Sequence, residues 1–429
     1  MGGGPDEERQ SAAVAKCVSD IESADFVALD FEFSGLFLQT ERDKRILSIE
    51  DLYDKCAESI PEFLALQLGL SCARRRQEDG IWELRSHEFN LWPQERRIFT
   101  ADLQSLRFLR AHGFDFNAYF ASAYKYARVP PADTDQAASM RRLPPTHATR
   151  VVAALRKSRV PLIFHNGMLD LVHFYDKFVG VLPDESKEFC EAWTAQFPLL
   201  FDTRFIAQEG RFQVLRQVGG LSLGDLHRHL SSLPDVPVKF ERAGPLGAGT
   251  AAHGSSGFDA IMTAEVFVME MDMWLRHAAS GGNKRRRQAA PNTGADSAKE
   301  APAAAAVEGA PAAESASAAA VPASAPPPAE PDDGGGWTVV SRKRPLDGAA
   351  ASGAAASGLV SPSLLESHDV CRKFHNKIAV MGAAPPVMDL GRPPGLQIAP
   401  GPPPPPASAG PSPPGQAASD GGGGGGALA

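Results

Sequence analysis

The chain has 429 residues, a formal net charge of −8 at neutral pH and five cysteines. The cysteines are odd in number and show no Cys-x-x-Cys spacing, which argues for a reducing compartment and against a disulfide framework or a zinc module. No run of about 18 apolar residues occurs, so the sequence excludes a membrane span.

Composition divides the chain near Ser280. Trp337 and Phe374 are the only aromatic residues beyond it, and basic and acidic residues are equal in number over 281–429, so the whole net charge falls on 1–280. A segment poor in large apolar side chains cannot offset the entropy of ordering it. We therefore expect one folded domain, 1–280, and a disordered low-complexity tail, 281–429. Since the domain is acidic, a local groove or bound cations must hold any nucleic acid.

The first half of the domain is expected to contain a meander. The apolar, aromatic-rich run Phe26–Phe33 has the length of a buried central strand. Two further strands, Glu62–Ala73 and Gly80–Phe89, are separated by a charged turn, which predicts at least one antiparallel neighbour. After Thr100, the predicted N-cap, Leu103–Ala111 has the apolar spacing of a helix.

The second half repeats a strand and helix rhythm. The expected strands are Pro161–Phe164 and Leu199–Asp202, and the expected helices are Leu169–Phe178, Ser222–Leu230 and Asp259–His277. Strands followed by helices imply parallel crossovers. The predicted fold class is therefore α/β, a mixed central sheet flanked by helices on both faces.

The tail offers short linear motifs in place of a fold. Lys284–Arg287 and Arg342–Pro345 are basic clusters typical of nuclear import signals. As import signals they predict a protein in the nucleus with a share in the cytoplasm. The alternative is that they are merely solvated basic patches. Arg392–Leu396 resembles a ligand of GYF adaptor domains, and Pro402–Pro406 offers a polyproline surface to a proline-binding adaptor. Leu364–Val380 has enough apolar residues for a short helix on a partner, or is structureless.

Two acids in the first strand form the most unusual feature of the sequence. Asp30 and Glu32 are two residues apart in an otherwise apolar run, and the period of a strand places both carboxylates on one face. Like charges in an apolar element repel unless a cation or strong donors compensate them. The alternative is that the pair lies at the solvated C-terminal end of the strand.

Further acids follow at the starts of predicted helices. Asp170 comes directly after a short buried strand, and Asp259 opens the last helix after a loop that carries His253. Taken singly, the acids read as helix-terminus residues and His253 as a loop histidine. Together with Asp30 and Glu32, Asp170 and Asp259 form a set of oxygen ligands of the kind that binds Mg²⁺ or Mn²⁺. Two such ions about 3.5–4 Å apart can support phosphodiester hydrolysis. Histidine on a loop has a pKa suited to accept a proton from the attacking water.

These motifs resemble, in order and context, those of the DEDD 3′-to-5′ exonucleases of the type with a catalytic histidine (DEDDh). Within that superfamily the chain is similar to the deadenylases of the poly(A)-specific ribonuclease family. The stretches that narrow the resemblance are His112–Asn117, Phe197–Arg204 and Gly257–Thr263. The likeness runs from about Val14 to Trp274.

The resemblance implies a ribonuclease-H-like (DnaQ-like) fold and removal of 3′ adenosines as AMP from single-stranded poly(A) RNA, with two Mg²⁺ or Mn²⁺ ions per site. It assigns metal binding to four acids, Asp30, Glu32, Asp170 and Asp259, and the general base to His253. It also places Phe33 and Phe116 near the terminal nucleotides, where core packing is the alternative, and Arg204 near the phosphates. A homodimer is a further family expectation.

Two other functions remain open at the sequence level. A same-fold alternative is an exonuclease that trims other RNA 3′ ends, such as small nuclear RNA tails, or single-stranded DNA. An alternative of another class is a catalytically silent RNA-binding scaffold, although such a binder has no chemical use for a costly cluster of acids.

Overall fold

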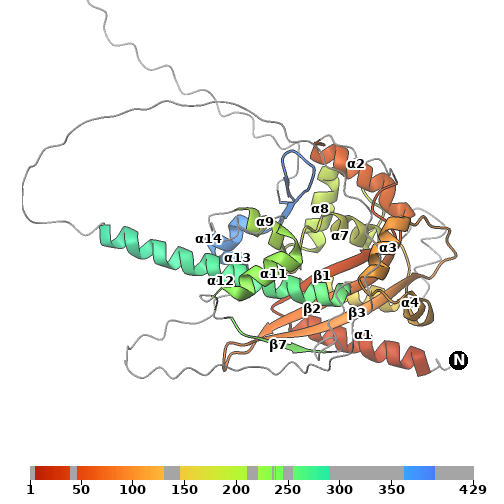
Figure 1. Cartoon of the computed structure of the whole chain (residues 1–429), viewed down its shortest axis with the longest axis horizontal. Helices are drawn as coiled ribbons and strands as arrows, with labels where there is room; N and C mark the ends of the chain where they lie inside the picture. The colour runs from red at the N-terminus through yellow and green to blue at the C-terminus, as the bar shows by residue number, and fades with distance from the viewer. Residues whose placement is uncertain are drawn as a thin grey trace, which may run out of the picture. The chain divides into compact units, whose positions relative to one another are not determined.

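The computed structural model describes residues 5–38, 46–129, 145–209, 221–233, 236, 238–244, 255–288 and 362–391 (Figure 1). The helices are α1 Pro5–Ser23, α2 Ile49–Ser59, α3 Leu103–Ala111, α4 Phe116–Ser122, α6 His147–Ser158, α7 Met168–Phe174, α8 Ser186–Gln196, α9 Thr203–Gln208, α11 Leu223–Ser232, α12 Ser256–Gln288, α13 Pro362–Ser367 and α14 Asp369–Phe374. The strands are β1 Phe26–Phe33, β2 Ala65–Arg75, β3 Trp82–Pro93, β4 Tyr124–Tyr126, β5 Leu162–Phe164, β6 Leu200–Asp202, β7 Phe240–Ala243, β8 Lys377–Ala379 and β9 Val387–Asp389. The described residues up to Arg276 and those of 362–391 belong to one compact unit, whereas the end of α12 belongs to a second.

A seven-stranded sheet organises the compact unit. Its order is β4-β3-β2-β1-β5-β6, and β7 pairs with β3. β2 is antiparallel to both β1 and β3, which confirms the predicted meander, and β1, β5 and β6 are parallel, which confirms the predicted crossovers. The sheet is therefore mixed, as expected.

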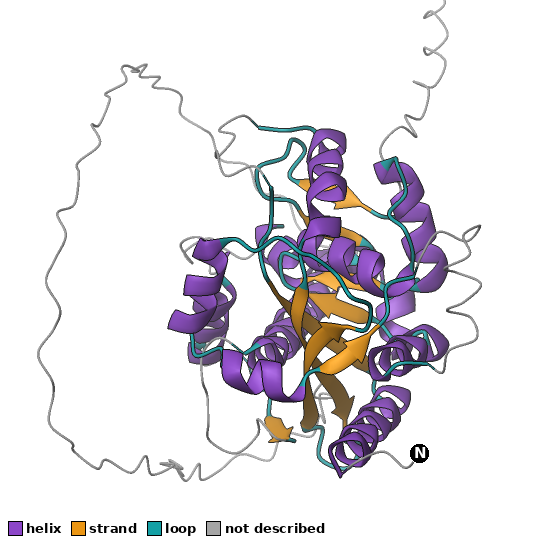
Figure 2. Cartoon of the chain, turned by 90° about the vertical axis from the view of Figure 1, so that its right-hand side faces the viewer, coloured by secondary structure: helices purple, strands orange, loops and turns teal. Residues whose placement is uncertain are grey.

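Alternation along β1 divides the core into two layers. Val27 and Leu29 face a cluster that includes residues of α1, α2, α6, α7 and α8. Phe26 and Ala28 face the opposite cluster, to which α9, α12 and α14 contribute. Helices therefore cover both faces of the sheet, and Figure 2 shows the strands enclosed between them.

Local signals predicted some element bounds better than others. β1 and α3 have the predicted bounds, but Asp102, and not Thr100, caps α3 by accepting a hydrogen bond from the backbone N–H of Gln104 (3.0 Å). The helix predicted over Leu169–Phe178 is α7 followed by a π-helical turn, Tyr175–Val179. The predicted cap of α11, Ser222, is confirmed.

Residues 362–391 correct the expectation that 281–429 carries no fold. This segment, here called the C-terminal segment, forms α13, α14 and the antiparallel pair β8–β9. Its apolar side chains, among them Phe374, Ile378 and Met388, are buried in the two cores. The short helix expected within Leu364–Val380 is thus realised within this chain's own fold.

Several expectations fall outside the described residues. These are the roles of His253, of the basic cluster Arg342–Pro345, of the GYF-like motif Arg392–Leu396 and of the side chains of Lys284–Arg287. All five cysteines are free and buried. Within the part of the chain that the structure describes, no helix combines the length and apolar character needed to cross a membrane.

Candidate active site

The site begins with the C-terminal half of β1. Because Phe26 and Ala28 face the α12 layer, the period of two carries Asp30 and Glu32 onto the same face. On this face of β1, the apolar residues Phe26 and Ala28 are thus followed by two carboxylates that point toward α12. The solvated strand end considered from sequence is not what the structure shows, since both side chains are partly buried.

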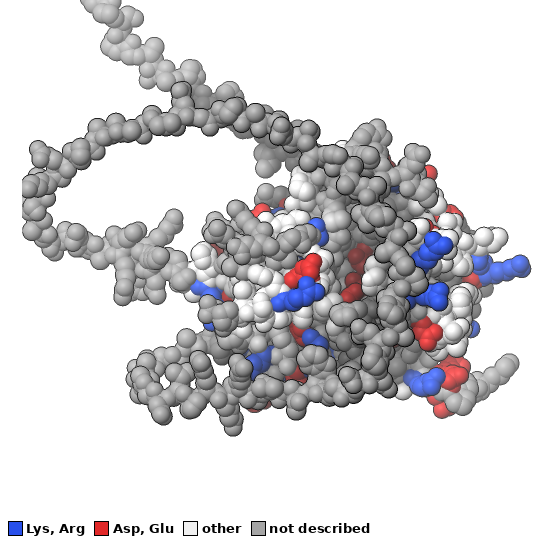
Figure 3. Space-filling model, in the orientation of Figure 1, with Lys and Arg blue, Asp and Glu red and all other residues white. Residues whose placement is uncertain are grey.

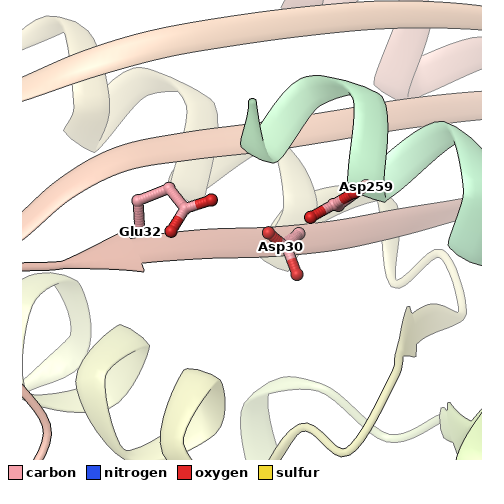
Figure 4. Close-up of side chains that lie close together, drawn as sticks. All are labelled: Asp30, Glu32 and Asp259. Atoms are coloured by element: carbon pink, nitrogen blue, oxygen red, sulfur yellow. The ribbon is translucent and has the colours of Figure 1, made fainter. Parts of the chain in front are cut away.

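A third carboxylate comes from the first turns of α12. Carboxylate oxygens of Asp30, Glu32 and Asp259 all lie within 4.8 Å of one another. Figure 4 shows the three carboxylates converging, two from β1 and one from α12. Three acids at this separation form an oxygen-only donor set that suits Mg²⁺ or Mn²⁺.

Gly69 allows α12 to approach the sheet this closely. It pairs with Asp30 across β1 and β2 and with Glu88 across β2 and β3. A Cβ at Gly69 would lie 2.0 Å from the carbonyl oxygen of Ser256 and 2.4 Å from the backbone nitrogen of Gly257. The backbone of the first turn of α12 therefore lies directly against β2, beside Asp30.

Two side chains of the sheet hold that turn in place. Gln67 on β2 accepts hydrogen bonds from the backbone N–H and the hydroxyl of Ser256, both at 3.0 Å. Glu88 on β3 accepts from the hydroxyl of Ser255 and from the backbone N–H of Gly257. These bonds satisfy donors at the start of α12 and fix the position from which Asp259 reaches the site.

The fourth predicted acid, Asp170, lies in the first turn of α7. The backbone N–H of Phe31, the residue between Asp30 and Glu32, acts on this carboxyl and lowers its pKa, against the larger effect of burial. Asp170 lies outside the cluster of three within 4.8 Å, but its charge acts on both acids of β1. The structure thus brings all four predicted acids to one place.

The electrostatics of the acids reflect this crowding. Burial, followed by the charges of Asp259 and Asp170, raises the pKa of Asp30 well above its usual value and that of Glu32 to about 8. Burial likewise raises the pKa of Asp170 to about 7. Ionising all of these groups without a compensating cation is therefore costly. A bound divalent ion would remove this cost.

Charge on the face shown in Figure 3 is mixed in sign among the described residues. On the face shown in Figure 3, Lys and Arg side chains lie next to Asp and Glu, and no broad area of one sign stands out among the described residues.

The three predicted substrate contacts have other partners in the structure. Phe33 is buried in the core and stacks on His173, with ring centroids 3.9 Å apart. Phe116 is partly buried and packs against Phe114, with centroids 4.8 Å apart. Arg204 donates a hydrogen bond to the carbonyl of Leu221 (3.0 Å). Their contacts with a substrate stay predictions.

Sequence reasoning missed three acids: Glu88 and Asp202, which bond to the turns that carry site acids, and Glu270, farther along α12. The sequence does not identify Glu88, because only the register of β2 and β3 places it beside Gly69. Asp202 is fully buried at the end of β6. Glu270 is fully buried on α12, and among the described residues neither of its carboxylate oxygens has a hydrogen-bond partner. The one available signal for Glu270 is its position inside the apolar run of a helix.

Glu270 gives a prediction about stability and pH. Burial, aided by the charge of Asp202, raises the pKa of Glu270 well above its usual value. A carboxyl whose pKa is higher in the folded state destabilises the fold as pH rises above its unfolded pKa of about 4.3. Glu270→Gln should therefore raise Tm by roughly 2–8 °C at pH 8 and much less at pH 4.5.

A matched control lies on the same helix. Glu265 is buried but accepts hydrogen bonds from His227 and Arg242, and these partners lower its pKa. Glu265→Gln should therefore lower Tm at pH 8, opposite in sign to Glu270→Gln. If thermal melts gave equal changes in Tm for the two variants at pH 8, ionisation of Glu270 would not be what destabilises the fold.

The chain belongs to the CAF1 ribonuclease family, whose model matches residues 7–143 and 132–267, more than half of the chain. Among curated proteins it is 32% identical over 123 residues to the poly(A)-specific ribonuclease PARN of zebrafish, covering 28% of this chain and 18% of the relative. It is 33% identical over 132 residues to the mouse poly(A)-specific ribonuclease PNLDC1, covering 29% of this chain and 24% of the relative. The matched part thus spans less than a quarter of either relative.

Among solved structures, that of S. pombe Pop2p in an Mg²⁺- and Mn²⁺-bound form is 20% identical, with a TM-score of 0.40, covering 61% of this chain and 88% of that one. The expected membership in the DEDD superfamily, with relatives among the poly(A)-specific ribonucleases, is confirmed. The expected ribonuclease-H-like fold, a mixed sheet flanked by helices, is confirmed as well.

Proposed function

We propose that the protein is a metal-dependent 3′-to-5′ exoribonuclease that removes adenosines from RNA 3′ ends as AMP. The single observation that carries this proposal is the convergence of Asp30, Glu32 and Asp259, with Asp170 alongside. Family membership supports the same reaction class. A scaffold without catalysis has no need for acids held at an electrostatic cost.

The site residues fit one or two divalent cations. Asp30, Glu32 and Asp259 would hold the first, and Asp170, whose charge acts on both acids of β1, would take part in holding a second. When bound, such ions stabilise the charge that develops on the attacking and leaving oxygens of a phosphodiester. The chain's own contribution is the rigid placement of the acids by β1, α7 and α12.

The proton acceptor is proposed to be His253. It stands six residues before Asp259 in the sequence. An imidazole has a pKa suited to deprotonate water near neutral pH. A hydrolysis that releases AMP needs such a base, because the water must lose a proton as it attacks the terminal phosphodiester.

The test is hydrolysis of oligonucleotides that share one body and end in A, U, C or G tails, with Mg²⁺ and the full-length protein. We expect a ladder of single-nucleotide steps from the 3′ end, fastest on the A tail, with AMP as product. Equal rates on all four tails would favour the trimming of other RNA 3′ ends. A lack of cleavage on every tail, with metal bound, would refute the nuclease function.

A further inference from the structure

The C-terminal segment lies along the edge strand β6 of the sheet. Asn376, whose φ of 57° is left-handed, donates its backbone N–H to the carbonyl of Leu200 (2.7 Å). Its side-chain oxygen accepts from the N–H of Leu200 (3.0 Å), and its side-chain nitrogen donates to the carbonyl of Pro198 (2.9 Å). One asparagine thus supplies three hydrogen bonds to the backbone around an edge strand, satisfying groups that would otherwise lack partners.

Apolar contacts fasten the same segment to the core. Phe374 packs on Trp274 of α12, with ring centroids 4.9 Å apart, and on Phe205 of α9 at 6.2 Å. Leu47 forms a backbone bridge with Ala383, in which Ala384 donates its N–H to the carbonyl of Leu47 (2.8 Å). The segment is therefore part of the domain, although about 70 residues of low complexity separate it from α12.

Asp202, at the end of β6, is the point where this segment meets the site. Its fully buried carboxylate accepts four backbone N–H groups. One oxygen accepts from Asn166 (3.1 Å) and from Phe205 (3.2 Å). The other accepts from Gly167 (3.1 Å) and from Ala379 of β8 (3.2 Å). A buried carboxylate needs such a full donor set, so the Ala379 amide is one of four donors that hold it in place.

The donors on the other side belong to the turn that starts α7. Asn166 has a left-handed φ of 58°, and Gly167 is the N-cap residue of α7. A Cβ at Gly167 would lie 2.5 Å from the Cβ of Phe164, so the turn is closely packed against β5. Asp170 follows in the first turn of the helix. The carboxylate of Asp202 thus sets where α7 begins and where Asp170 is presented.

We propose that the C-terminal segment is needed to complete the active site. Ala379 supplies the fourth hydrogen-bond donor to the Asp202 carboxylate, and Asp202 positions the turn before α7 from which Asp170 reaches the site. Asp202 and Asn376 are then positioning residues, and this role rests on the function proposed above. The stretch that looks like a tail thereby contains a part that the site requires.

The test uses the full-length protein with Asp202→Asn, Asn376→Gly and the double variant. Asn376→Gly keeps the left-handed backbone accessible and removes only the side-chain bonds. We expect each single variant to weaken Mn²⁺ binding in calorimetry roughly 10–100-fold and to lower kcat on oligo(A) with little change in KM. Since both act through one contact, the double variant should lose much less than the product of the two effects.

Amide hydrogen exchange of the metal-free proteins supplies a readout that does not depend on catalysis. The N–H groups of Asn166 and Gly167 should exchange faster in both single variants. Arg372→Ala is the matched control, because Arg372 lies in the same segment, is exposed and does not bond to β6. It should leave exchange, Mn²⁺ binding and kcat unchanged.

Two outcomes would overturn the inference. One is a lower Tm for Asn376→Gly with unchanged Mn²⁺ affinity and unchanged exchange at Asn166 and Gly167, which is the result of a purely structural role. The other is multiplicative effects in the double variant. If Asn376→Gly does not fold, Asn376→Asp, which keeps the acceptor for Leu200 and loses only the donor to Pro198, provides a milder variant for which the same changes in exchange and Mn²⁺ affinity, smaller in size, are expected. A wild-type protein that binds Mn²⁺ but cleaves no RNA would refute the proposed function alone, and the Mn²⁺ and exchange data would still decide the inference.

Discussion

Replacing any one of the four acids by its amide, as in Asp30→Asn, Glu32→Gln, Asp170→Asn or Asp259→Asn, should reduce RNA hydrolysis by a factor of about 10³ or more. Each change removes a negative ligand from a cluster that would work by charge stabilisation, and the shape of the side chain is retained. Mn²⁺ titrations paired with turnover on a short oligo(A) are the measurement. Near-normal turnover in any of the four variants would contradict the assignment.

The fold should survive these changes. Burial and neighbouring charges raise the pKa of Glu32 to about 8, so ionising Glu32 costs stability as pH rises from about 4.3 toward 8. Glu32→Gln removes that cost. The Tm of the metal-free variant should therefore equal or exceed that of the wild type at pH 8, and the difference should vanish near pH 4.

His253→Ala is the matched variant that separates metal binding from proton transfer. It leaves the acid cluster complete, so Mn²⁺ affinity should stay close to that of the wild type. Turnover should fall about 10²–10⁴-fold, because the proton acceptor is lost. Loss of Mn²⁺ binding in His253→Ala would show that the imidazole is a ligand and not the base.

The acids on β1 show what a sequence can predict about a site. Phe26–Phe33 is apolar except for Asp30 and Glu32, so the strand and its bounds follow from local pattern, and the period of two of a strand gives the shared face of the two acids. Asp259 and Asp170 are also predictable from sequence, because each stands near the start of a predicted helix. The acids meet in space because parallel crossovers bring their strands and helices together. The alternation of strands and helices along the sequence predicts these crossovers.

Contacts that depend on register or on distant segments were not predictable in the same way. Glu88 is an ordinary acid of an alternating strand until β2 places it beside Gly69. The composition of 281–429 does not reveal the C-terminal segment, because Ala, Pro and Gly outweigh the few buried side chains of 362–391. The C-terminal segment is structured because it packs on β6, and such tertiary contacts cannot be predicted from local propensity.

Gly69→Ala should cause the largest loss from a single methyl group. The added Cβ would lie 2.0 Å from the carbonyl oxygen of Ser256, and this neighbour is backbone that no rotamer change can move. The first turn of α12 must then shift away from β2, which breaks its bonds to Gln67 and moves Asp259 away from Asp30. Overpacking of this kind costs about 1–3 kcal/mol, and a displacement of about 1 Å at a catalytic group can cost about 10²-fold in rate.

Gly224→Ala provides the matched control for this prediction. Gly224 lies in the first turn of α11, and a Cβ there meets no atom within 4 Å. Alanine in a helix is favoured over glycine by up to about 1 kcal/mol, so this variant should be as stable as the wild type or slightly more so, with unchanged turnover. Thermal melts, Mn²⁺ titrations and turnover on oligo(A) should therefore separate the two substitutions. If Gly69→Ala matched Gly224→Ala in all three measurements, the close approach of α12 to β2 would not be what places Asp259 in the site.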